Sequence, residues 1–169
     1  MSIIIKKVKP IINYAVVELC KRPYPGRPHG CPNYNKKKRC PPNVERFDEF
    51  YDMTKPFYAI INVFDLQAHV EKMRQRHPNW TERQLRNCLY WQHTARKHLK
   101  EAIFDFYKQN KGFRITVCPE GMGVNVFLTM KNAGIQMQWP PNTIAYQVAI
   151  AGVHKRHINN DEEPIVDFS

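Results

Sequence analysis

The chain has 169 residues, 43% of them apolar, which is enough for one hydrophobic core and short for two. No stretch approaches the roughly 18 uninterrupted apolar residues of a membrane span, and the three isoleucines near the N-terminus fall far short of a signal peptide. The sequence therefore predicts a cytoplasmic protein with no membrane contact. We expect a single domain at residues 1–157 and an acidic tail at residues 158–169.

Basic side chains dominate the charge of the chain, whose formal net charge is +11. The last twelve residues carry four acids and no Lys or Arg, and removing those four negative charges leaves +15 on residues 1–157. Such a surface favours a polyanionic partner, foremost RNA, because each phosphate bound by Lys or Arg releases counterions. The alternative is a basic surface that serves only solubility.

Strands and helices alternate along the chain, which predicts an α/β fold in one compact domain, with a mixed sheet, flanking helices and an irregular cysteine-rich metal loop. β-branched and aromatic residues predict strands, which are expected at residues 11–19, 57–64, 113–118, 135–139 and 144–153. Short helices are expected at residues 44–53 and 124–133.

The longest predicted element begins at residues 81–84, Thr-Glu-Arg-Gln, which form a capping box preceded by Trp80. A helix of some seven turns is expected to continue to about Lys108. Cys88 falls on the apolar stripe of this helix, which predicts a buried structural cysteine.

The segment CKRPYPGRPHGCPNYNKKKRCPP, residues 20–42, holds three of the five cysteines between prolines, glycines and basic residues. In a reducing compartment an odd number of cysteines argues against a disulfide framework and favours metal binding. Cys20, Cys31 and Cys40 are separated by ten and then eight residues, a spacing that suits a group wider than one ion. An iron–sulfur cluster, 4Fe–4S above all, is the occupant we expect.

Zinc is the alternative metal, although the chain lacks the Cys-x-x-Cys knuckle typical of structural zinc sites. His29 and Cys118 could complete a tetrahedral zinc site with the loop cysteines. If three thiolates hold a 4Fe–4S cluster, one iron has no cysteine ligand, and such an open position is a feature of reactive metal sites. Cys118 could instead close that position as a fourth ligand.

Glu120 follows Cys118 in a Pro-Glu-Gly-Met-Gly segment that leads into a predicted helix. A carboxyl beside a desolvated cluster could act as an acid or a base. The alternative role is a carboxylate that complements the dipole of the helix N-terminus.

Several segments together resemble a known family. They are Cys-Lys-Arg-Pro-Tyr-Pro-Gly at 20–26, Gly-Cys-Pro-Asn-Tyr at 30–34, Cys-Pro-Pro at 40–42, Pro-Glu-Gly-Met-Gly-Val-Asn-Val-Phe at 119–127 and Trp-Pro-Pro at 139–141. The pattern is similar to the small, largely uncharacterised "predicted metal-binding" cysteine-rich proteins of bacteria and archaea. This resemblance implies that Cys20, Cys31 and Cys40 bind the metal and that the Pro-Glu-x-x-Gly-Val-Asn-Val segment lies close to it.

Two functions from different classes remain open at this point. In the first, the protein is a small iron–sulfur enzyme whose open iron supports sulfur transfer, desulfuration or redox chemistry on a nucleobase or RNA. In the second, a structural cluster or zinc ion supports a basic nucleic-acid-binding module that catalyses no reaction. In both, a run of four cations between two expected ligands would bring phosphates to the metal loop, and it consists of Lys36, Lys37, Lys38 and Arg39.

Overall fold

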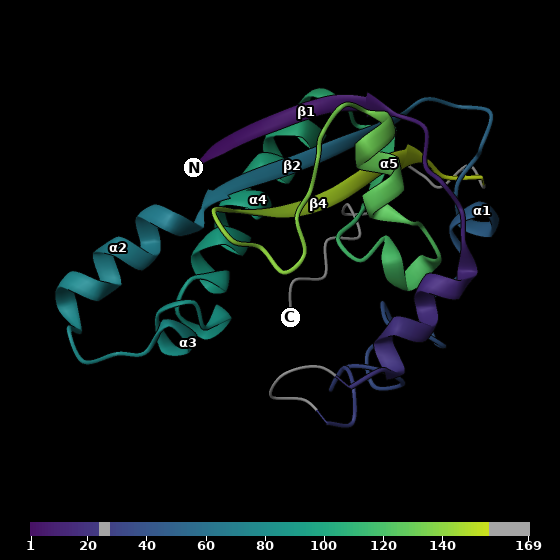
Figure 1. The fold of residues 1–169 in the computed structure, drawn as a ribbon. Helices are drawn as coiled ribbons and strands as arrows, with labels where there is room; N and C mark the ends of the chain where they lie inside the picture. The colour runs from purple at the N-terminus through teal and green to yellow at the C-terminus, as the bar shows by residue number, and fades with distance from the viewer. Residues whose placement is uncertain (24–27, 156–169) are drawn as a thin grey trace.

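The computed structural model describes residues 1–23 and 28–155. Its centre is a four-stranded sheet in the order β1-β2-β4-β3 (Figure 1). The strands are β1 (Ser2–Val8), β2 (Phe57–Asp65), β3 (Phe113–Thr116) and β4 (Ile144–Val153). The predicted α/β class and compact domain are confirmed, with antiparallel pairing between all these neighbours rather than mixed directions. The expected acidic tail lies outside the described residues.

Helices cover both faces of this sheet. The α-helices are α1 (Phe47–Phe50), α2 (Leu66–Arg76), α3 (Glu82–Leu85), α4 (Gln92–Gln109) and α5 (Val126–Asn132). The described residues also form three 3-10 helices, namely η1 (Tyr14–Lys21), η2 (Cys88–Tyr90) and η3 (Glu120–Met122). Figure 1 shows α4 behind the sheet and α5 in front of it.

The central strand β2 is buried on both faces, which explains its nearly continuous apolar sequence. Successive side chains of a strand point to opposite faces. Ile61 therefore packs on the α5 side with Met130, whereas Ile60 packs on the α4 side with Leu99 and Ile103. Burial of each such side chain contributes about 1.5–3 kcal/mol before the entropy of ordering it is subtracted.

The single long helix expected from residue 81 to about Lys108 is wrong. The structure has two α-helices there, α3 and α4, with the 3-10 helix η2 between them. The capping box at Thr81 is present. The Thr81 side chain accepts a hydrogen bond from the Gln84 amide, and the Gln84 side chain accepts one from the Thr81 amide. However, α3 ends at Leu85, and the Asn87 side chain accepts from the Leu89 amide to start η2. The chain turns there, so Cys88 is exposed instead of buried.

The N-terminal prediction is also corrected. Residues 11–19 were expected to form a strand, but Asn13 accepts a hydrogen bond from the Ala15 amide and caps η1. Of the predicted strand, only an isolated bridge between Ile12 and Val124 remains. The edge strand is instead β1, which the sequence reading missed, as it missed α2.

Other element boundaries shift by smaller amounts. The predicted strands at 57–64 and 144–153 are confirmed. The strand expected at 113–118 and the helices expected at 44–53 and 124–133 are present but shorter than expected. The structure describes residues 135–139 fully and assigns them no strand.

Candidate metal centre

The helix η1 brings Cys20 to the segment that contains Cys118. The Asn13 amide donates to the Gly123 carbonyl at 2.8 Å, and the Asn125 amide donates to the Ile11 carbonyl at 2.8 Å. These two bonds fix the start of η1 beside the chain that leads into α5. Cys20 lies in the last turn of η1, and η1 packs along η3.

A tyrosine locks this arrangement. A Cβ on Gly123 would lie 2.4 Å from the Tyr14 ring, and Gly123 has a φ of 97°, so a side chain there would be both clashing and strained. The Tyr14 hydroxyl donates to the Asp48 carboxylate, and the Arg46 guanidinium lies over the Tyr14 ring at 4.7 Å. Burial, followed by the contact with Asp48, raises the pKa of Tyr14 to about 12. Tyr14 therefore joins η1 to α1, the two elements that flank the cysteine-rich loop.

Backbone hydrogen bonds shape the loop between these elements. The Cys31 amide donates to the Cys20 carbonyl at 2.7 Å, and the Asn35 amide donates to the Pro41 carbonyl at 2.8 Å. Gly30 has a φ of 78°, and a Cβ there would lie 2.6 Å from the Cys20 carbonyl oxygen. Glycine thus allows the Cys20 and Cys31 backbones to approach closely.

Four of the five cysteines come together from three segments of the chain. Cys40 is buried, Cys20, Cys31 and Cys118 are partly buried, and all are free thiols. Burial raises the pKa of Cys20, and the neighbouring Cys31, Cys40 and Glu120 raise it further. Burial, then Glu120, raises the pKa of Cys118 to about 12, with smaller contributions from Cys40 and Cys20. Cys20 and Cys40 therefore lie close enough to Cys118 for their charges to interact, and Cys31 lies as close to Cys20 and Cys40.

Gly121 leaves the space in which Cys118 sits. A Cβ on Gly121 would lie 2.9 Å from the Cys118 sulfur and 3.2 Å from Cδ of Pro41, the residue after Cys40. The Gly121 amide also hydrogen-bonds to the Cys118 sulfur and lowers its pKa, in opposition to burial. Gly121 is therefore the point where the loop and the Cys118 segment meet.

Glu120 is an exposed residue, and desolvation of its carboxyl by neighbouring protein atoms raises the pKa of this group. Its influence on Cys20 and Cys118 places it beside the thiols, as predicted from the sequence. It is also the first residue of η3, the position at which a carboxylate complements the dipole of a helix.

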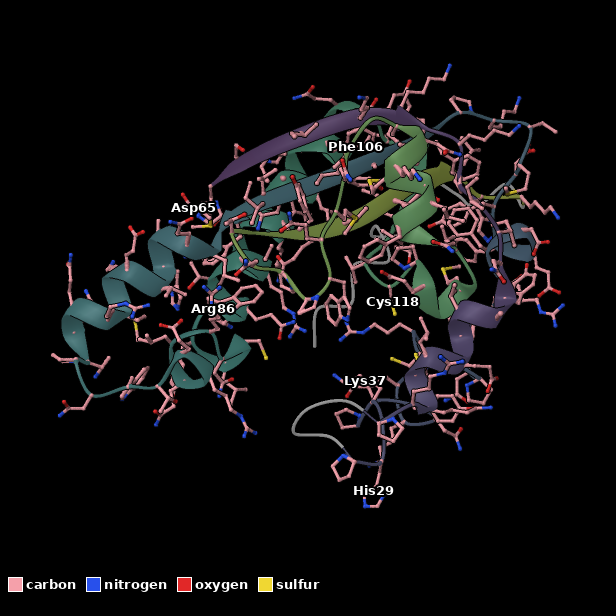
Figure 2. All side chains as sticks on the ribbon, in the orientation of Figure 1. His29, Lys37, Asp65, Arg86, Phe106 and Cys118 are labelled. Carbon is pink, nitrogen blue, oxygen red and sulfur yellow. The ribbon has the colours of Figure 1, made fainter. Side chains whose placement is uncertain are left out.

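The remaining predicted residues lie at different distances from the thiols. His29 is exposed and sits at the outer end of the loop, with Lys37 between it and Cys118 (Figure 2). Lys36 and Lys38 are exposed. Tyr24 and Gly26 of the loop fall outside the described residues, and Cys88 is the first residue of η2, between α3 and α4 in the chain.

Among residues 1–23 and 28–155, no group of three or more His, Cys, Asp or Glu side chains has an arrangement that could hold a metal ion. No helix in the same ranges is long and apolar enough to cross a membrane. The donor chemistry is nevertheless specific, since a set of converging thiols suits soft metals such as zinc, copper(I) and iron–sulfur clusters.

Fold and thiols together define a small α/β protein with a cysteine-rich loop suited to thiolate ligation. A family model described as "Predicted metal-binding protein (DUF2284)" matches residues 16–118, which is more than half of the chain and includes all five cysteines. The chain belongs to this predicted metal-binding family, and the resemblance seen in the sequence is confirmed. Searches of curated proteins and of solved structures found no match.

Sequence reasoning missed Tyr14, Asp48 and Gly121, which help to position the thiols. The signal for Gly121 was present, because it stands in the Pro-Glu-Gly-Met-Gly segment next to Cys118. The pairing of Tyr14 with Asp48 spans 34 residues and has no local signature.

Proposed function

We propose that Cys20, Cys31 and Cys40 bind one iron–sulfur cluster, most readily of the 4Fe–4S type, in a small cytoplasmic enzyme. The observation that carries the proposal is the convergence of these three thiols with Cys118: Cys31 and Cys40 raise the pKa of Cys20, Cys31 raises that of Cys40, and Cys40 and Cys20 raise that of Cys118. Clustered thiolates repel one another, and a bound cationic group offsets that repulsion. The five free cysteines suit a reducing compartment.

Two glycines beside the thiols also support the proposal. Gly30 and Gly121 are positions where a side chain would press on the Cys20 backbone and on the Cys118 sulfur, respectively. Both glycines thus allow the segments that carry the thiols to pack closely against one another. The ten-residue and eight-residue separations of the loop cysteines favour a cluster over the single zinc ion that remains the alternative.

The proposed reaction is sulfur transfer or redox chemistry on a nucleobase or RNA. When bound by three thiolates, a 4Fe–4S cluster offers one iron without a cysteine ligand, which can bind a sulfur or oxygen atom. Glu120 would hold or release a proton next to Cys20 and Cys118. Lys36, Lys37, Lys38 and Arg39 would hold phosphates at the same loop.

Purification without oxygen tests this proposal directly. We expect a brown protein with visible absorption and with iron and acid-labile sulfide in similar amounts. Replacing Cys20, Cys31 or Cys40 singly by Ser should abolish the colour, while Cys88→Ser should keep it. Colourless protein containing zinc, or full iron in all three loop variants, would contradict the cluster assignment.

The second candidate is a basic nucleic-acid-binding module with a structural cluster or zinc ion. The position of Cys118 beside the loop thiols favours it, because a fourth thiolate would close the site. Retention of nucleic-acid binding in a protein whose cluster gives no response to added ligands would support this candidate over the enzyme.

A further inference from the structure

The strand β1 leaves one edge of the sheet unpaired. It is the first strand in the order β1-β2-β4-β3, so no strand among the described residues lies on its outer side. Its sequence, SIIIKKV, has three consecutive isoleucines, Ile3, Ile4 and Ile5, which are 38%, 38% and 51% exposed. An exposed, apolar edge strand presents free backbone donors and acceptors and is a template for pairing with another strand.

A groove continues this apolar edge onto α4. Ile5 pairs with Ile60, whose side chain faces α4, so Ile5 and Ile3 face α4 as well. With Ala102 and Phe106 of α4 they line a groove of about 340 Å³. Glu101 and Asp105 also line this groove and are exposed to solvent.

We propose that a second copy of this chain pairs with this edge, β1 against β1 and antiparallel, across a two-fold axis. The result is a continuous sheet of eight strands in a homodimer. A two-fold axis requires a surface that complements itself. An antiparallel pair of β1 strands meets this requirement, because the backbone N–H groups of each strand face the carbonyl groups of the other and isoleucines face isoleucines.

The charges of β1 select the register of this pairing. When the axis passes through Ile4, this residue meets its symmetry mate and Ile3 meets Ile5 of the second copy. Lys6 and Lys7 then lie opposite Ser2 and Met1, so the lysines of the two copies do not face one another. Like charges directly opposite in a sheet are destabilising, which disfavours registers centred farther along the strand.

Charge complementarity on the α4 face points to the same partner. Lys7 lies on the same side of the strand as Ile3 and Ile5, because the three positions alternate by two. In the dimer this lysine lies at the end of the partner's strand that precedes its Ile3, beside a groove whose lining includes the acidic residues Glu101 and Asp105. The four isoleucines contributed by Ile3 and Ile5 cover the apolar floor in both copies.

Light scattering coupled to size exclusion tests the dimer. At about 100 µM, where an interface of micromolar affinity is formed, we expect twice the monomer mass for the wild type and the monomer mass for Ile5→Lys. The matched control is Ile144→Lys, which changes an isoleucine that is 37% exposed at the start of β4 and should remain dimeric. Circular dichroism reports whether each variant is folded.

Crosslinking tests the register without a charge in the edge. In a Cys88→Ala background, Ile4→Cys should form an intermolecular disulfide on mild oxidation, because directly opposite Cβ atoms lie about 5 Å apart. Ser2→Cys should not, since its symmetry mate lies opposite Lys6, four residues and thus about 14 Å along the strand at about 3.4 Å per residue. A monomeric wild type, a dimer that survives Ile5→Lys, or equal crosslinking at both positions would overturn the proposal.

Discussion

The Cys118 sulfur lies directly against Gly121, so close that a Cβ on this glycine would come within 2.9 Å of it. The same Cβ would lie 3.2 Å from the Pro41 ring, beside Cys40. Two segments far apart in the sequence thus meet at a residue without a side chain. The position of Cys118 relative to the loop thiols depends on this contact.

Gly121→Ala should therefore weaken metal binding more than it weakens the fold. The added methyl would displace the Pro41 ring, which follows the proposed ligand Cys40, and changes that disturb metal ligands through their neighbours typically lower affinity about 10-fold or more. Iron and sulfide per folded chain measure the effect. Gly112→Ala is the matched control, because nothing lies within 4 Å of its Cβ position. Equal metal content in both variants would contradict the role assigned to Gly121.

Cys88→Ala should leave both the metal and the stability unchanged. The sequence predicted a buried cysteine, but Cys88 is exposed in η2, and exposed substitutions typically change the free energy of unfolding by no more than about 0.5 kcal/mol. Chemical denaturation and metal analysis measure both quantities. Rapid labelling of Cys88 by a thiol reagent in the metal-loaded protein should accompany this result. A metal-free variant would place Cys88 at the centre after all.

Local signals predicted the parts of the fold that depend on neighbours in sequence. The capping box at Thr81 and Gln84 formed as expected because it involves only one turn of chain. The helix beyond it did not continue, since the Asn87 side chain accepts a hydrogen bond from the Leu89 amide and caps the start of a new helix, η2. A periodic apolar pattern cannot report such a break, which is why the burial of Cys88 was wrong.

The candidate site shows the same division. The spacing of Cys20, Cys31 and Cys40 is visible in the sequence, and the chain belongs to a predicted metal-binding family. The contacts that orient the thiols are long-range, such as Tyr14 with Gly123 and with Asp48. These contacts depend on the sheet that places η1 beside η3, so no local pattern predicts them.

Replacing Lys36 and Lys38 by Ala should reduce the salt dependence of RNA binding. Both residues are exposed on the cysteine-rich loop. If each contacts one phosphate of a single strand, the slope of log K against log salt should fall in magnitude by about 1.4. Fluorescence anisotropy with labelled RNA at several salt concentrations measures the slope. The double variant Arg96→Ala with Lys97→Ala, on α4, is the control for total charge. An unchanged slope in the loop variant, or no RNA binding at low salt, would leave a small molecule as the substrate.

Cys118→Ala should keep the cluster, because the proposed ligands are the three loop cysteines. The thiol of Cys118 lies beside Cys20 and Cys40, and in the proposed site it would compete for the position that a substrate atom would occupy. Removing it should leave iron and sulfide intact and make the visible spectrum more responsive to added sulfide or to a thionucleobase. Cys40→Ala, which removes a buried loop thiol, is the matched control and should lose the cluster. Loss of the cluster in Cys118→Ala as well would make the site a closed set of four thiolates. In that case no iron would be free for a substrate, and the non-catalytic binding module would replace the enzyme as the proposed function.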